Sequence, residues 1–172
     1  MKKVFAILVA AVLLGGGALA IASLAGATPG NGTGKSSKAN RVLFALLKGR
    51  NEISPQTGRK GAGDLDGRGG FTAVIADNKV CFGLTVDNIL QPIAAHIHRG
   101  KPSENGPIVV TFTPKLPTSG DPGASGDCVL PDNGNTAVLD EILAHPNHFY
   151  ANVHTTDFQG GAIRGQLTHR RP

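Results

Sequence analysis

Tryptophan is absent from the 172 residues of this chain, and aromatic residues together make up only 5% of it. Glycine and proline are abundant instead, with 24 and 11 residues respectively. Helical bundles need long stretches without these two residue types, so the composition disfavours that class and favours short strands joined by many turns. The length accommodates one domain of ordinary size.

A clustered basic segment is also lacking, although the formal net charge is +5. The lysines and arginines are scattered along the chain instead of gathering in one stretch. Recognition of nucleic-acid phosphates needs a clustered basic face, so the sequence predicts no nucleic-acid partner.

Signatures of the common catalytic sites are missing. Ser125 does not lie in a GxSxG elbow, and the sequence has no HExxH motif. Glu104, Asp140 and Asp157 are isolated carboxylates without a second acid at catalytic spacing. The sequence therefore gives no indication of an enzyme, and the first hypothesis is a non-enzymatic binding or structural module.

Cysteine occurs only twice, at Cys81 and Cys128, without the CxxC spacing of zinc or redox motifs. An even number of cysteines in an exported chain usually means disulfide bonding, which predicts a bond between these two residues. The alternative hypothesis is a pair of buried free thiols.

Residues 1–27 have the pattern of an export signal. Lys2 and Lys3 precede an uncharged apolar run at residues 4–14, and small residues suitable for cleavage follow. An uncleaved N-terminal membrane anchor is the alternative, because the apolar stretch is about long enough to span a bilayer. Either form predicts a secreted or cell-surface protein that touches a membrane only through this segment.

The remainder divides into a linker and one folded part. Residues 28–40 are rich in glycine, serine and lysine and predict a flexible linker, and residues 41–169 are expected to form the β domain. Alternating apolar patterns predict about seven strands, at residues 42–47, 70–76, 79–86, 93–98, 108–113, 150–154 and 162–168.

Asp77 and Asn78 predict a tight hairpin between the second and third strands, since both residue types tolerate positive φ. One short helix is expected between Asn135 and Pro146. Residues 120–135 are expected to form a long turn-rich loop. The predicted fold class is all-β: an antiparallel Greek-key or immunoglobulin-like sandwich or barrel with one short helix.

Histidines give the sharpest local feature. Side chains alternate along a strand, so His96 and His98 share one face and Ile97 occupies the other. His154 lies on another predicted strand. If the two strands are neighbours, the three imidazoles converge on a site suited to copper or zinc. The alternative is that they bond loop carbonyls and serve the architecture alone.

Several longer strings resemble the CHRD domain family, a module described in chordin and found alone in exported bacterial proteins. They are AHIHRG at residues 95–100, NGPIVV at 105–110, YANVHT at 150–155 and GGAIRGQL at 160–167. The start, with Leu47, Gly49, Glu52 and Pro55, resembles the family's opening pattern. The resemblance covers about residues 42–168. One departure is Ala162, where the family's string has glutamate.

The resemblance implies an extracellular β-rich module with no agreed catalytic activity. It leaves both a structural and a metal role open for the three histidines. Arg164 lies in the last string, where it is either a clamp on carbonyl groups or an anion-binding group. An unknown extracellular or envelope partner is expected. An analogy with copper/zinc superoxide dismutases is weaker, because the complete ligand set of those enzymes is not found.

Overall fold

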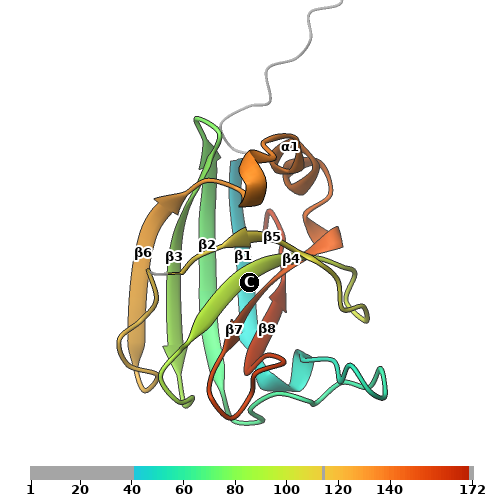
Figure 1. The fold of residues 1–172 in the computed structure, drawn as a ribbon, viewed down its shortest axis with the longest axis vertical. Coiled ribbons are helices and arrows are strands. Elements are labelled where there is room, and N and C mark those ends of the chain that lie inside the picture. Colours follow the sequence, from blue (N-terminus) through green and yellow to red (C-terminus); the bar gives the residue numbers. More distant parts are fainter. Residues whose placement is uncertain (1–40, 114, 171–172) are drawn as a thin grey trace, which may run out of the picture. The chain divides into compact units, whose positions relative to one another are not determined.

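The computed structural model describes residues 41–113 and 115–170 of the chain. These residues form one continuous antiparallel sheet of eight strands, in the order β5-β4-β7-β8-β1-β2-β3-β6. The sheet curls into a nearly closed barrel, with β5 and β6 as its two free edges (Figure 1). The strands are β1 (Val42–Lys48), β2 (Arg68–Ala76), β3 (Lys79–Asp87), β4 (Ala94–Arg99), β5 (Ile108–Thr111), β6 (Gly123–Val129), β7 (Phe149–His154) and β8 (Ile163–Gln166).

The predicted fold class is confirmed, with the barrel as the form that the sheet takes. All seven predicted strands are present with their ends shifted by a few residues. Asp77 and Asn78 form the predicted hairpin turn between β2 and β3, with φ values of 51° and 61°. The helix α1 (Ala137–Ala144) also forms where expected, and Pro146 begins a short 3-10 turn directly after it.

The eighth strand, β6, corrects the prediction of a loop at residues 120–135. Its sequence, GASGDCV, has no alternation of apolar and polar residues to indicate a strand. It pairs with β3 over seven residues, from Val80 opposite Val129 to Val86 opposite Gly123. Because such a ladder uses backbone groups, it can form along a free strand edge without an alternating side-chain pattern.

The core fills the interior of the barrel. Leu43, Ala45 and Leu47 alternate inward along β1, whereas Leu46 between them is 48% exposed. The same alternation on the other strands builds a single apolar cluster. Helix α1 contributes Val138 and Ile142 to this cluster and lies at one end of the strands (Figure 1).

The seam between the two free edges is closed by side chains. Phe112, just after β5, packs against Phe82 of β3 with ring centroids 4.3 Å apart. Lys115 Nζ lies 3.2 Å from Asp127 Oδ2 on β6. The barrel is thus completed by an aromatic contact and an ion pair where ladder hydrogen bonds end.

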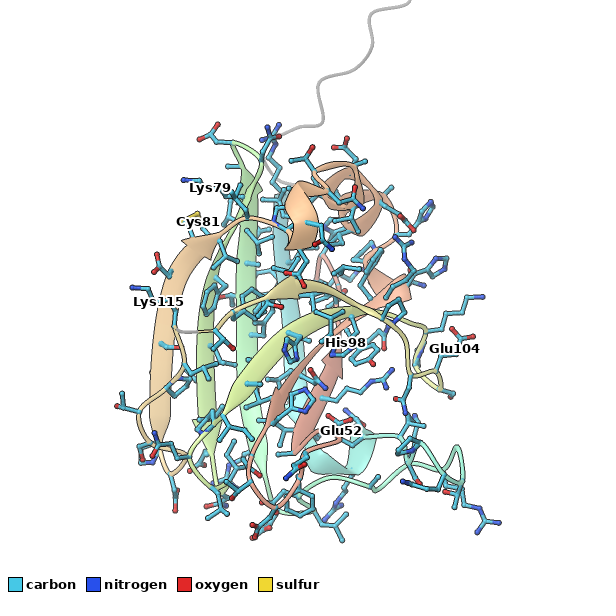
Figure 2. The ribbon with its side chains drawn as sticks, viewed as in Figure 1. Glu52, Lys79, Cys81, His98, Glu104 and Lys115 are labelled. Carbon is cyan, nitrogen blue, oxygen red and sulfur yellow. A yellow bond between two sulfur atoms is a disulfide. The ribbon has the colours of Figure 1, made fainter. Side chains whose placement is uncertain are left out.

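Two parts of the outward side of the barrel differ sharply. The covered face, on β4, β7 and β8, carries polar side chains that are buried or half-buried under loops: His96, His98, Tyr150, Asn152, His154 and Arg164. The open face, on β1, β2, β3 and β6, carries small or exposed residues such as Gly70, Thr72, Val74, Gly83 and Thr85. Figure 2 labels His98, Glu104 and Glu52 on one side of the molecule and Cys81 and Lys115 on the other.

The predicted signal or anchor at residues 1–27 and the linker at residues 28–40 lie outside the described residues. Within the described part of the chain, no helix is long and apolar enough to cross a membrane.

Candidate metal centre

Strand pairing brings the three predicted histidines together. β4 and β7 are direct antiparallel neighbours, with His96 opposite Asn152 and Ala94 opposite His154. One ligand atom from each of His96, His98 and His154 lies within 4.8 Å of the others. Strand alternation predicts that His96 and His98 share a face, and the pairing of β4 with β7 brings His154 to the same face.

Two of these imidazoles have a hydrogen-bond partner that fixes where their proton lies. His98 Nδ1 is 2.8 Å from the carbonyl oxygen of Gly106, and His154 Nδ1 is 2.8 Å from that of Gln159. A carbonyl oxygen only accepts, so each Nδ1 donates its hydrogen. In the neutral ring, each Nε2 then carries a lone pair available to a metal.

The remaining nitrogen atoms face one another. His98 Nε2 is buried and has no hydrogen-bond partner among the described residues. His96 Nδ1 lies 3.1 Å from His154 Nε2. Nitrogen ligands about 2.0 Å from a tetrahedral zinc ion are about 3.3 Å apart, so this separation suits two ligands of one ion.

Burial keeps all three rings neutral. It lowers the pKa of His96 to about 4, and the neighbouring His154 and His98 lower it further. Burial also lowers the pKa of His98 and of His154, against the raising effect of their bonds to carbonyl groups. Neutral imidazole is the form that binds metal, so the site is ready to ligate at neutral pH.

The histidines can therefore hold loop carbonyl groups and bind a metal at the same time, so the two hypotheses for them do not exclude each other. One nitrogen of His98 and one of His154 hold loop carbonyls, as the architectural hypothesis expects. The opposite nitrogen of each ring remains for an ion. Outer hydrogen bonds of this kind are the usual way in which proteins orient histidine ligands.

Arg164 is only 1% exposed, and its contacts are those expected of a clamp on carbonyl groups. It donates to the backbone oxygens of Lys101 and Glu104, at 3.0 and 2.7 Å, and to Asn105 Oδ1, at 2.9 Å. These acceptors belong to the loop whose Gly106 oxygen accepts from His98. Arg164 thus holds in place the loop that orients a candidate ligand, and its donors point to protein groups.

Tyr150 connects the clamp to the histidines. Its ring stacks on His98 with centroids 4.9 Å apart and planes inclined by 6°. The guanidinium carbon of Arg164 lies 3.4 Å from the centroid of the same ring. The His98 ring is therefore held by two contacts, the stack on Tyr150 and the hydrogen bond to the Gly106 oxygen.

Glu52 is a buried acid that the sequence analysis did not single out as a site residue. It is 2% exposed, and its Oε1 has no hydrogen-bond partner among the residues described. Burial raises its pKa to about 8, although the positive charge of Arg164 acts in the opposite direction. It lines a pocket of about 200 Å³ together with Asp157 and Gly161.

Glu52 stands in the sequence only as part of the family's opening pattern, and its close packing involves distant glycines. A Cβ atom at Gly161 would collide with the Glu52 carboxyl group, and one at Gly63 would collide with its Cγ. Both close approaches exist only after the chain has folded.

The two cysteines lie far from the histidines in the strand order. Cys81 on β3 is directly opposite Cys128 on β6, and the two form a disulfide. The bond joins the edge strand β6 to the rest of the sheet. It is on the open face and has no part in the histidine cluster.

Comparison with known proteins identifies a family. A family model described as the CHRD domain matches residues 43–167, which is nearly the whole described part of the chain. No curated protein and no solved structure matches the chain.

Proposed function

The chain belongs to the CHRD domain family, and from this premise we infer that it is an exported, non-enzymatic module that binds copper or zinc through His96, His98 and His154. The observation that carries the proposal is the convergence of three neutral imidazoles, with a buried and unpartnered nitrogen on His98. A buried acceptor without a partner costs free energy, which a bound cation would offset.

The donor set favours these two metals. Imidazole nitrogens suit zinc and copper, whereas magnesium and calcium prefer sets of oxygen ligands. Three protein nitrogens also leave a coordination position open, so a bound ion would be accessible to a further ligand. Uptake or storage of the ion is the role that this arrangement supports.

Export is the second component of the proposal. The apolar segment at residues 4–14 after Lys2 and Lys3 supports it, and so does the disulfide, which is typical of oxidising compartments. The module would then act outside the cytoplasm, with an extracellular or envelope partner. Fractionation of cells that produce the full chain should find it outside the cytoplasm, and retention in the cytoplasm would contradict export.

The metal site is tested on tag-free full-length protein by elemental analysis after incubation with copper or zinc and removal of excess ion. Wild type should retain about one ion per chain, and the double variant His96→Ala/His98→Ala should retain less than about a tenth of that. The matched control is His145→Ala/His148→Ala, which removes another pair of neighbouring histidines beside α1, with ring centroids also 5.4 Å apart.

The control variant should bind as wild type does. Equal occupancy in wild type and in His96→Ala/His98→Ala would overturn the proposal, and so would the absence of metal from wild type.

A further inference from the structure

We propose that Asn152 is a fourth protein ligand of this centre and binds the ion through Oδ1. The inference rests on the proposed metal site and extends it from three donors to four. Nothing in the sequence pattern of the histidines points to this residue; its position in the sheet does.

Asn152 lies at the middle of the covered face. It is opposite His96 on β4 and opposite Arg164 on β8, so it stands between the candidate ligands and the clamp. It is also two residues before His154 on β7, and side chains at this spacing share one face. Only 3% of Asn152 is exposed, although its amide group is strongly polar.

The hydrogen-bond geometry around Asn152 has an excess of acceptors. Its Oδ1 lies 3.2 Å from His154 Nε2. The hydrogen of that ring is on Nδ1, where it is donated to the Gln159 oxygen, so Nε2 and Oδ1 both present lone pairs. His96 Nδ1 can donate a hydrogen to this Nε2, but no hydrogen lies between Nε2 and Oδ1, and a cation bound to both would stabilise the pair.

The same side chain also faces His98. Its partner in the ladder is His96, two residues before His98 on β4, and side chains at this spacing share one face. The unpartnered His98 Nε2, the His154 Nε2 and the Asn152 oxygen thus converge from two strands. A single ion satisfies all three acceptors at once.

A set of three imidazole nitrogens and one amide oxygen has defined consequences for the metal. Mixed nitrogen and oxygen ligands suit tetragonal copper(II), and zinc also accepts oxygen as a ligand. All four groups are uncharged, so the bound ion keeps its full double charge. A carboxylate in place of the amide would therefore strengthen the attraction for the ion.

The competing explanation is a purely structural amide turned by 180°, with Nδ2 donating to His154 Nε2. The two explanations predict opposite results for aspartate at this position. If Oδ1 is a metal ligand, Asn152→Asp keeps the ligand oxygen and adds a negative charge to it. If Nδ2 is a required hydrogen-bond donor, the same substitution removes that donor.

The experiment measures copper(II) and zinc dissociation constants by chelator competition at pH 8, for full-length wild type, Asn152→Ala and Asn152→Asp. We expect Asn152→Ala to weaken binding about 10- to 100-fold, as loss of a ligand or of its close support does in metal sites. Asn152→Asp should bind as tightly as wild type or more tightly. Electron paramagnetic resonance of the copper(II) forms should show a changed spectrum in Asn152→Ala with the nitrogen splitting retained.

The outcomes separate this inference from the proposed function. Wild type that binds metal while Asn152→Ala keeps its affinity and spectrum would overturn the fourth ligand alone. Binding weakened equally by alanine and aspartate would do the same, in favour of the structural donor. Wild type that binds neither ion would overturn both proposals. Circular dichroism of each metal-free variant checks that the barrel is folded.

Discussion

The covered and open faces of the barrel belong to the same sheet, yet their polar groups have different surroundings. Those of the open face are exposed to solvent, and those of the covered face are buried under loops. The open face presents the small residues Gly70, Thr72, Gly83 and Thr85 to solvent. The hydroxyl groups of Thr72 and Thr85 donate to the backbone oxygens of Gly83 and Gly70. On the covered face, polar side chains lie under loops, where each donor and acceptor needs a protein partner or an ion. The free-energy cost of burying polar side chains is therefore concentrated on the covered face.

The larger surface depression is not the one with unpartnered polar atoms. The open face has a wide hollow of about 840 Å³ beside Leu46, Val86 and Ala124. The pocket at Glu52, under the loops, has only about 200 Å³. Among the described residues, the buried side-chain atoms without a hydrogen-bond partner are Glu52 Oε1, beside the smaller space, His98 Nε2 and Ser125 Oγ. None of these three residues lines the larger hollow.

The largest predicted effect is on the open face and concerns the disulfide. Replacement of Cys81 and Cys128 by serine should lower the free energy of unfolding by about 4 kcal/mol, because the bond closes a loop spanning 47 residues in the unfolded chain. Denaturant unfolding measures the change. Metal affinity should stay within about twofold of wild type, because the bond does not touch the histidine cluster.

Stoichiometric labelling of both cysteines in unfolded, unreduced protein would contradict the prediction of an oxidised pair. A large loss of metal binding in the folded serine variant would show that the two faces are coupled.

A second prediction compares one residue type on both faces. Arg164→Ala should cost about 3 kcal/mol of stability, because it leaves the carbonyl groups of Lys101 and Glu104 and the Tyr150 ring without their buried partner. Arg68→Ala should cost less than about 0.5 kcal/mol. Arg68 forms an ion pair with Asp87 while its side chain is 61% exposed, and exposed pairs contribute little.

Thermal and denaturant unfolding of the two variants measure this contrast. Similar losses of unfolding free energy in Arg164→Ala and Arg68→Ala would show that burial of the Arg164 side chain does not determine its contribution to stability.

The last prediction concerns pH, and within any single pH unit its effect is smaller than the losses predicted for the disulfide and for Arg164. The pKa of Glu52 is about 8 in the folded protein and near its ordinary value of 4.5 in the unfolded chain. Folding therefore takes up a proton between these values, and the stability from Glu52 is fully present below about pH 4.5 and is lost as the pH rises through 8. The slope from this group is at most about 1.4 kcal/mol per pH unit.

Glu52→Gln removes that slope, so its stability should exceed that of wild type increasingly from pH 5 to pH 8. The matched control is Glu104→Gln, since Glu104 is an exposed acid on the neighbouring loop. The difference in unfolding free energy between wild type and each variant, followed across this range, isolates the contribution of each acid. Parallel curves for wild type and Glu52→Gln would show that the buried carboxyl group is already ionised at neutral pH.

Much of the fold could be predicted because alternation is a local property. The run from Lys79 to Val86 indicates a strand and its inner face without any knowledge of its neighbours. β6 could not be predicted in this way, because its glycine-rich sequence forms a ladder through backbone groups alone. The missing information was the free edge of β3, which exists only in the folded sheet.

The residues of the candidate site divide in the same way, into those that a local pattern predicts and those that depend on tertiary contacts. Residue type and spacing are enough to predict that His96 and His98 share a face, that strands dominate, and that Cys81 and Cys128 can pair only with each other. The folded sheet and its loops bring His154 and Asn152 beside His96 and His98, and they bury Glu52. Their places depend on which strands are neighbours and on which loops cover them, and such contacts join residues far apart in the chain, where no local pattern records them.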